Sequence, residues 1–173
     1  MEAKIVKASL KDADIILQLY RAAREYQRTK DGVVVWPVFG RSLVLAELRE
    51  GRQFKMMGGN EVACVWAVTF SDALIWGPKN ADAAVYVHRI AVHPKFRGRN
   101  LVGRIVEWAK EFAHGHGKRY VRLDTVGKNT RLIAHYTANG FQFLGCFPLA
   151  ETKGLPAHYA QAPVALFQLD LQA

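Results

Sequence analysis

A basic, glycine-containing turn is the first feature of the sequence that could perform chemistry. It reads Arg97-Gly98-Arg99-Asn100-Leu101-Val102-Gly103 and joins an apolar segment to an amphipathic one. Where a strand runs through such a turn into a helix, the first helical N–H groups have no acceptor within the helix, and the helix dipole adds positive potential. The turn therefore predicts an anion site that suits a phosphate group. The alternative is a solvated connection between two elements.

Asn129 and Tyr136 are the second pair whose spacing suggests a site. They are seven positions apart in the sequence. In a helix this separation corresponds to about two turns, so both side chains should lie on the same face. Taken alone, Tyr136 would more often be an ordinary half-buried aromatic residue than a reactive one.

His88 and Asp124 are candidates for acid–base chemistry. An unperturbed imidazole titrates near pH 6.5, roughly, which suits a general base. His88 precedes Ile90 by two positions and should share its strand face, and Asp124 lies at the end of a neighbouring strand. From there Asp124 could assist or orient His88, or bind a cationic amine. The alternatives are a core histidine that bonds a backbone carbonyl and a strand-end aspartate that binds loop N–H groups.

The elements that must position these residues follow from the hydrophobic period and from the turn residues. Ser9 and Asp12 predict a capping box at the start of the first helix. In chain order, we predict strand 4–8, helix 10–27, helix 41–50, strands 52–57 and 61–70, strand 84–92, helix 99–114, strand 119–126, a short helix between 129 and 139, and strands 141–147 and 162–171.

These elements predict a single domain over residues 1–173, because a chain of this length buries one continuous core. The stretch 84–126 reads strand, helix, strand, which implies a parallel pair of strands. The predicted fold class is α/β (α+β), with a mixed seven-stranded sheet, helices on both faces and the order β-α-α-β-β-β-α-β-α-β-β.

The composition limits the partners. The net charge of +9 and the pI of about 9.8 would attract nucleic acid, an acidic membrane or a nucleotide-like cofactor. Basic residues are spread along the chain without a polybasic tail, and no apolar run approaches the roughly 18 residues that cross a bilayer. Cys64 and Cys146 form no CxxC pair. We therefore expect a cytoplasmic protein without a membrane partner or a metal.

Two segments resemble the signature of the Gcn5-related N-acetyltransferase (GNAT) superfamily. The first is Ile90-Ala91-Val92-His93-Pro94 followed by Arg97-Gly98-Arg99-Asn100-Leu101-Val102, which is similar to the family's strand, Val-x-Pro-like step and Arg/Gln-x-x-Gly-x-Gly/Ala turn. The second is Asn129-Thr130-Arg131-Leu132-Ile133-Ala134-His135-Tyr136 with Asn139-Gly140-Phe141. Asn100 stands where the family usually has Gly, and Val102 where it usually has Gly or Ala.

The resemblance implies a mostly antiparallel acyl-CoA N-acyltransferase fold that uses acetyl-CoA as cosubstrate, without a metal. It implies that Tyr136 points at the cofactor sulfur. We therefore expect Tyr136 to act as the general acid, and from its own chemistry we expect His88 to act as the base, with Asp124 in one of the roles given above. The amine can also arrive neutral and lose its proton through water. The residues expected to bind the cofactor are Ile90, Ala91, Val92, Arg97, Gly98, Arg99, Asn100, Leu101, Val102, Gly103, Asn129 and Tyr136.

Trp36, in the loop between the first two helices, occupies a region that often lines the acceptor pocket in this family. Other residues that could contribute are Trp66, Trp76, His158 and Tyr159. The alternative for this loop is a plain hydrophobic cover over the sheet edge. The implied partners are acetyl-CoA and a small-molecule or peptide amine, and a homodimer would be in keeping with the family.

Two other functions are considered. Asn100 and Val102 depart from the family pattern, which suggests an acyl-CoA-binding regulatory module with little turnover. The net charge of +9 suggests a nucleic-acid-binding protein, but the sequence has no recognition motif or concentrated basic helix, so nucleic acid is not the expected partner.

Overall fold

The computed structural model describes residues 4–173. The main elements are β1 (Lys4–Lys7), α1 (Ala13–Arg28), α2 (Arg41–Arg49), β2 (Gln53–Gly58), β3 (Glu61–Thr69), α3 (Ala73–Trp76), β4 (Ala84–Val92), α4 (Leu101–Gly115), β5 (Tyr120–Val126), α5 (Thr130–Ala138), β6 (Gln142–Phe147) and β7 (Val164–Asp170). Short 3-10 helices cover Leu10–Asp12, Gly77–Ala81, Pro94–Phe96 and Ala157–Ala160. The predicted order is confirmed except for α3, a single turn too short to produce a hydrophobic period.

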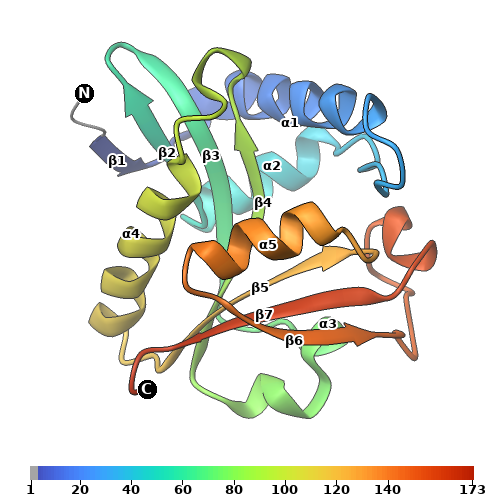
Figure 1. The fold of residues 1–173 in the computed structure, drawn as a ribbon. Helices are drawn as coiled ribbons and strands as arrows, with labels where there is room; N and C mark the ends of the chain where they lie inside the picture. The colour runs from blue at the N-terminus through green and yellow to red at the C-terminus, as the bar shows by residue number, and fades with distance from the viewer. Residues whose placement is uncertain (1–3) are drawn as a thin grey trace.

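One seven-stranded sheet runs in the order β1-β2-β3-β4-β5-β7-β6. β4 and β5 pair in parallel, as predicted, and the other neighbouring strands pair antiparallel. α4 and α5 pack on one face of the sheet, and α1 and α2 pack on the other (Figure 1). No helix among residues 4–173 is long and apolar enough to cross a membrane.

The start of the first helix shows why the sequence folds as it does locally. The Asp12 carboxylate accepts hydrogen bonds from the Ser9 N–H at 2.8 Å and from the Ser9 hydroxyl at 3.1 Å. Lys55 on β2 also donates to Asp12, at 2.6 Å. The predicted capping pair therefore ends the first strand, turns the chain into α1 and ties the helix start to the sheet.

β4 and β5 separate after a short stretch of pairing. Their register joins Ala84 to Tyr120 and continues only as far as Tyr86 and Arg122. Beyond this point the two strands diverge (Figure 1). The later residues of β4 consequently have one backbone edge that β5 does not pair, and an opening forms between the strands. Such an opening at the carboxyl ends of parallel strands is a common place for a ligand.

β4 also contains a bulge. His88 pairs with Ala67 and Ala91 pairs with Val65, so two β4 residues, Arg89 and Ile90, face a single residue of β3. Arg89 has a φ of 49°, which lies in the left-handed region.

The bulge changes which face each β4 side chain occupies. Val85 and Val87 belong to the core beneath α4, and Ile90 and Val92 pack against the same core, so the alternation shifts by one residue between Val87 and Ile90. The prediction that His88 shares a strand face with Ile90 is therefore wrong, because it assumed an unbroken two-residue period.

A buried polar network holds the bulged residue in place. Arg89 forms an ion pair with Glu47 of α2, whose side chain is only 3% exposed, and its Nε donates to the Tyr20 hydroxyl at 3.3 Å. Gln53 of β2 donates to the same Glu47 carboxylate at 2.6 Å and to Tyr20 at 2.9 Å. Residues from α1, α2 and β2 thus converge on the irregular point of β4.

Removing the partner of Arg89 should destabilise the whole fold. We expect Glu47→Ala to lower the free energy of unfolding by about 3–5 kcal/mol, since it leaves a buried guanidinium without its carboxylate. Urea denaturation followed by circular dichroism measures this. The control is Glu25→Ala, whose side chain is 56% exposed in surface pairs with Arg24 and Arg28 and should change stability by less than about 0.5 kcal/mol. Equal losses in the two variants would contradict the structural role of Glu47.

Candidate active site

An open groove of about 1050 Å³ runs over the turn between β4 and α4. Its lining includes most residues that the sequence assigned to cofactor binding: Ile90, Val92, Arg97, Gly98, Arg99, Asn100, Leu101, Val102, Asn129 and Tyr136. Ala91 and Gly103 do not line it. The Ala91 side chain is instead packed in the core beneath α1 and α2.

The turn has the geometry of an anion site. Gly98 has a φ of 77°, and Asn100, directly before α4, adopts a left-handed conformation with φ 49° and ψ 45°. Asn is one of the few residues that adopt this conformation routinely. The Asn100 side chain makes no capping bond to α4, so the first N–H groups of this 15-residue helix face the groove without a side-chain acceptor.

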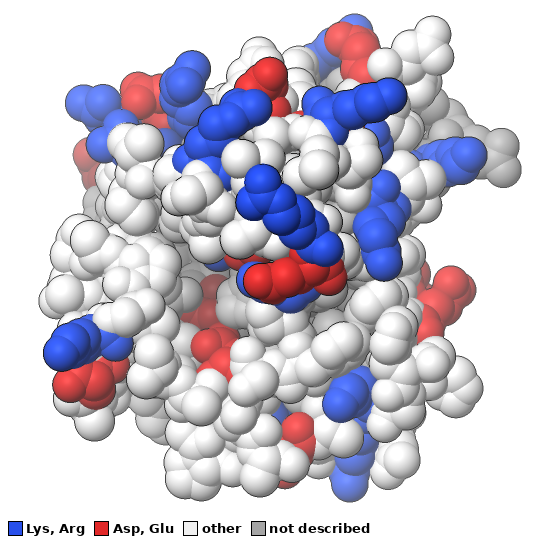
Figure 2. All heavy atoms as spheres, turned by 180° about the vertical axis from the view of Figure 1, so that it is seen from behind, with Lys and Arg blue, Asp and Glu red and all other residues white. Residues whose placement is uncertain are grey.

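Positive charge surrounds this turn. Lys30, Arg97, Arg99 and Arg131 line the groove, and none of them forms an ion pair with another residue of the range 4–173. Arg97 is anchored to α1, where it donates to the Ala22 carbonyl at 3.1 Å and lies 4.2 Å above the Tyr26 ring. On the face in Figure 2, by contrast, basic side chains are interleaved with acidic ones and form no continuous stripe.

α5 presents Asn129 and Tyr136 on one face, as their spacing predicts. The Asn129 Oδ1 accepts from the Leu132 N–H at 3.1 Å and caps the helix. Tyr136 is 8% exposed and packs against the rings of Phe141 and Phe167. Its hydroxyl makes no hydrogen bond to another described residue, which leaves it available to a ligand.

A second, smaller cavity of about 190 Å³ lies between β4 and β5, in the opening that their divergence creates. Ile90, Asn129 and Tyr136 line both this cavity and the groove, so the two spaces meet at these residues. Aromatic side chains line part of the cavity, namely Trp36, Phe39, His158 and Tyr159. Trp36 lines both the cavity and the groove, and its role in binding an acceptor stays a prediction.

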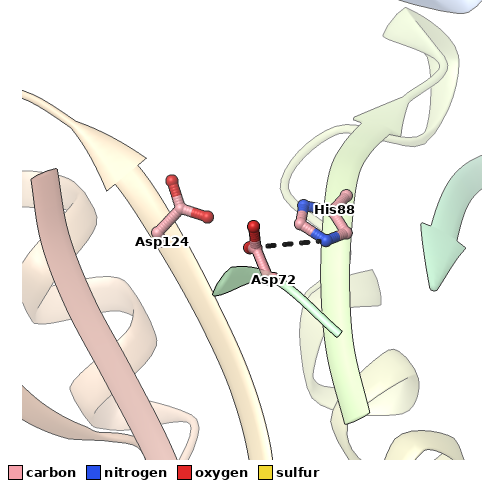
Figure 3. A group of neighbouring side chains, drawn as sticks. All are labelled: Asp72, His88 and Asp124. Atoms are coloured by element: carbon pink, nitrogen blue, oxygen red, sulfur yellow. Dashed lines mark ion pairs between the residues drawn. The ribbon is translucent and has the colours of Figure 1, made fainter. Parts of the chain in front are cut away.

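Three titratable side chains gather at the acidic end of this cavity (Figure 3). One carboxylate oxygen of Asp72, one of Asp124 and one ring nitrogen of His88 all lie within 4.8 Å of one another. Asp72 precedes α3 and lies between β4 and β5, with one carboxylate oxygen 3.8 Å from the His88 Nε2. The His88 Nε2 also lies 3.2 Å from the Thr69 hydroxyl, and Tyr159 donates to the Asp124 carboxylate at 2.8 Å.

Burial controls the charges of this group. It raises the pKa of Asp72 to about 7, and the neighbouring Asp124 adds to this effect. It also raises the pKa of Asp124 to about 6, against the opposing hydrogen bond from Tyr159. Burial, with Arg89 and Arg52 nearby, lowers the pKa of His88 to about 3. His88 is thus neutral at pH 7, and the two aspartates are the groups that exchange protons near neutral pH.

The same causes act on Tyr136. Burial raises the pKa of its hydroxyl above the ordinary value, and the nearby Cys64 and Asp124 act in the same direction. The phenol therefore holds its proton throughout the physiological range.

The sequence missed Asp72. It lies in the segment between β3 and β4, where Pro, Gly and Asn prevent any periodic pattern, and its only signal was the position before a short helical turn. Two of the tryptophans proposed for the acceptor pocket do not reach it. Trp66 lies in the core beneath α4, and Trp76 lies in the core beside α3, whereas His158 and Tyr159 do line the cavity.

Comparison with known proteins agrees with this geometry. Residues 18–141 match the model of the acetyltransferase (GNAT) family. The uncharacterized N-acetyltransferase YesJ from Bacillus subtilis is 29% identical over 106 residues, which cover 59% of this chain and 59% of YesJ.

Solved structures share the fold. A GNAT-family acetyltransferase from Listeria monocytogenes has a TM-score of 0.77 at 20% identity, covering 99% of this chain and 96% of that one. A phosphinothricin acetyltransferase from Sinorhizobium meliloti, solved in complex with acetyl-CoA, has a TM-score of 0.70 at 16% identity, covering 99% of this chain and 89% of that one. The chain belongs to the acetyltransferase (GNAT) family, and the resemblance seen in the sequence is confirmed.

Burying Asp72 should cost stability at neutral pH. The pKa of Asp72 rises from 3.8 to about 7 on folding. The resulting loss in the free energy of unfolding is therefore absent below pH 3.8, grows as the pH rises and is complete above about pH 7. One pKa unit corresponds to about 1.4 kcal/mol, so we expect Asp72→Asn to stabilise the protein by about 1–3 kcal/mol at pH 8 and by much less at pH 4.5. Urea denaturation at the two pH values measures this.

The control for this experiment is Asp14→Asn, which makes the same chemical change at a side chain that is 84% exposed. It should change stability by less than about 0.5 kcal/mol at both pH values. A gain for Asp72→Asn that does not depend on pH would show that Asp72 does not carry the expected buried charge.

Proposed function

We propose that this protein transfers an acetyl group from acetyl-CoA to a primary amine by direct attack in a ternary complex. The observation that carries the proposal is the junction at Ile90, Asn129 and Tyr136, where a basic groove meets an acidic cavity. A phosphate-bearing donor fits the groove and an amine fits the cavity, so the reacting atoms would meet beside the Tyr136 hydroxyl.

The groove suits the pyrophosphate arm of acetyl-CoA. Free N–H groups at the start of α4 and the guanidinium groups of Arg97 and Arg99 supply hydrogen bonds and positive charge. The left-handed Asn100 allows the turn to present its backbone to the phosphates. Acetyl-CoA supplies the activated acyl group. The β4 backbone near Ile90, which β5 does not pair, would donate to the acyl carbonyl oxygen and stabilise the negative charge that develops there.

Asp124 is the residue proposed to take the proton of the attacking amine. It lines the cavity, and its pKa of about 6 leaves it mostly ionised at pH 7, close enough to neutrality to accept a proton and release it again. His88, the histidine that the sequence suggested for this role, is neutral and holds a proton too weakly. We propose instead that His88 orients the aspartates through its contact with Asp72.

Tyr136 is proposed to protonate the leaving sulfur. As the new C–N bond forms and the C–S bond breaks, the thiolate would take the phenolic proton of Tyr136 while Asp124 takes one proton from the nitrogen. Both residues line the cavity on which the reacting groups would converge. The amide and the CoA thiol then leave, and the proton on Asp124 returns through water to the Tyr136 phenolate, which restores the starting state. An acceptor that arrives as an ammonium loses one further proton to water before it attacks.

Two measurements test the proposal: acetyl-CoA binding by calorimetry, and release of the CoA thiol with a panel of primary amines. Micromolar binding together with amine-dependent release is expected. Tight binding without release for any amine would favour the regulatory module instead. If the protein binds nucleic acid at physiological salt and does not bind acetyl-CoA, the proposal is refuted.

Tyr136→Phe should separate binding from chemistry. The variant keeps the aromatic packing against Phe141 and Phe167 but loses the proton donor. Loss of a general acid costs about 10²–10⁴-fold in kcat, and the affinity for acetyl-CoA should change by less than about threefold. The matched control is Tyr26→Phe at the groove edge, which should retain kcat. Unchanged turnover in Tyr136→Phe would remove this residue from the mechanism.

The rate should depend on pH through Asp124. Because Asp124 acts in its ionised form, kcat/KM should rise with pH and show an inflection near 6. The measurement needs an acceptor amine whose own pKa lies well above this range. Asp124→Asn should remove the inflection and lower the rate. An inflection that survives in Asp124→Asn would assign the titration to another group.

A further inference from the structure

The acidic end of the cavity carries negative charge that the protein does not neutralise. Neither Asp72 nor Asp124 forms an ion pair with a Lys or Arg of residues 4–173, although the chain carries a net charge of +9. Their contacts are with neutral groups, namely His88 and the Tyr159 hydroxyl. A buried carboxylate without a cationic partner is costly, so this pair is not explained by fold stability.

Arg89 lines the same cavity and favours the ionised form of Asp124, but its ion pair is with Glu47 and not with either aspartate. Despite Arg89, burial holds the pKa of Asp124 at about 6 and that of Asp72 at about 7. A cationic ligand bound beside the two carboxyl groups would supply the ion-pair partner that they lack within residues 4–173.

His158 supplies a second and independent indication of a ligand. It lines the cavity and is only 6% exposed, yet its Nδ1 has no hydrogen-bond partner in the described structure. Burial lowers the pKa of His158 to about 4, so the ring is neutral at pH 7 and can accept a hydrogen bond. Thr125 also lines the cavity and has a buried hydroxyl without a partner among the described residues. Buried polar atoms are rarely left unpaired, which points to a donor that enters with a ligand.

The remaining walls are apolar and aromatic, from Trp36, Phe39, Val34 and Leu123. The cavity of about 190 Å³ is small. At about 30 Å³ for each water in the liquid, it holds the equivalent of about six waters, which is the size of a small molecule or of one side chain.

We propose that this cavity selects a small primary ammonium on an apolar or aromatic stem that lacks a neighbouring carboxylate, with Asp124 and Asp72 attracting the cation and His158 accepting one of its hydrogens. This assignment rests on the proposed acetyl transfer, because it names the acceptor of that reaction. An α-amino acid would bring its own carboxylate close to two buried carboxylates and meet no free cation in the cavity. The amine that lacks the carboxylate is therefore preferred.

Matched pairs of ligands test the selection without turnover. Calorimetry of the whole protein, without acetyl-CoA, compares phenethylamine with phenylalanine and 3-methylbutylamine with leucine at pH 7.5. We expect at least one amine to bind roughly tenfold or more tightly than its amino acid, because like charges repel strongly where water is scarce.

Asp124→Asn should weaken the binding of that amine by roughly tenfold, and Asp72→Asn should weaken it by a smaller factor because Asp72 does not line the cavity wall directly. Both changes remove a buried charge without changing side-chain size. Asp14→Asn on the exposed face of α1 is the matched control and should leave binding unchanged.

The outcomes separate this inference from the proposed function. Failure of both amines to bind, equal binding of amine and amino acid, or unchanged binding in Asp124→Asn would overturn the inference. If an amine binds selectively but releases no CoA thiol, the cation site stands and the acetyl transfer fails. If amines and amino acids are acetylated with equal kcat/KM, the transfer stands and the selection fails.

Discussion

The buried ion pair between Arg89 and Glu47 is the interaction on which the site depends. It holds Arg89 in a left-handed conformation that a bulky residue adopts only when its surroundings impose it. The resulting bulge turns Ile90 and Val92 toward the core beneath α4 and coincides with the stretch where β4 no longer pairs with β5. The cavity lies beside this bulge, between residues of β4 and β5 that do not pair with each other.

The distribution of charge is related to the same opening. Among the described residues, the groove carries basic side chains without ion-pair partners near the start of α4. The cavity between β4 and β5 carries carboxylates without ion-pair partners in the same range at its acidic end. The two regions meet at Tyr136, a neutral group whose elevated pKa keeps it protonated between them. The net charge of +9 is therefore a poor guide to the site, because it averages two regions of opposite sign. In the proposed reaction, local charge would favour the phosphate-bearing donor in the groove and the amine in the cavity.

Much of this fold was predictable from the sequence, because its long helices and strands have clear periods and clear turn residues. The common face of Asn129 and Tyr136 followed from helix geometry alone. The bulge in β4 could not be predicted. The assignment of side chains to strand faces assumed a regular two-residue alternation, and nothing in the sequence indicates the left-handed φ of Arg89. Asp72 was missed for a different reason: it reaches the site through tertiary packing of a non-periodic segment, and only the position of β4 relative to β5 brings it beside His88 and Asp124.

The turn before α4 shows how a departure from the family pattern can be accommodated. Asn100 replaces the usual glycine and keeps the left-handed backbone, while the Val102 side chain packs into the core beneath the helix. A Cβ at Gly103 would lie 2.8 Å from the Asn100 Nδ2 and 2.9 Å from the Asn139 Oδ1. Any larger residue at 103 would thus displace the side chain of Asn100 or of Asn139. Gly103 therefore leaves the space that the Asn100 side chain occupies beside the first turn of α4.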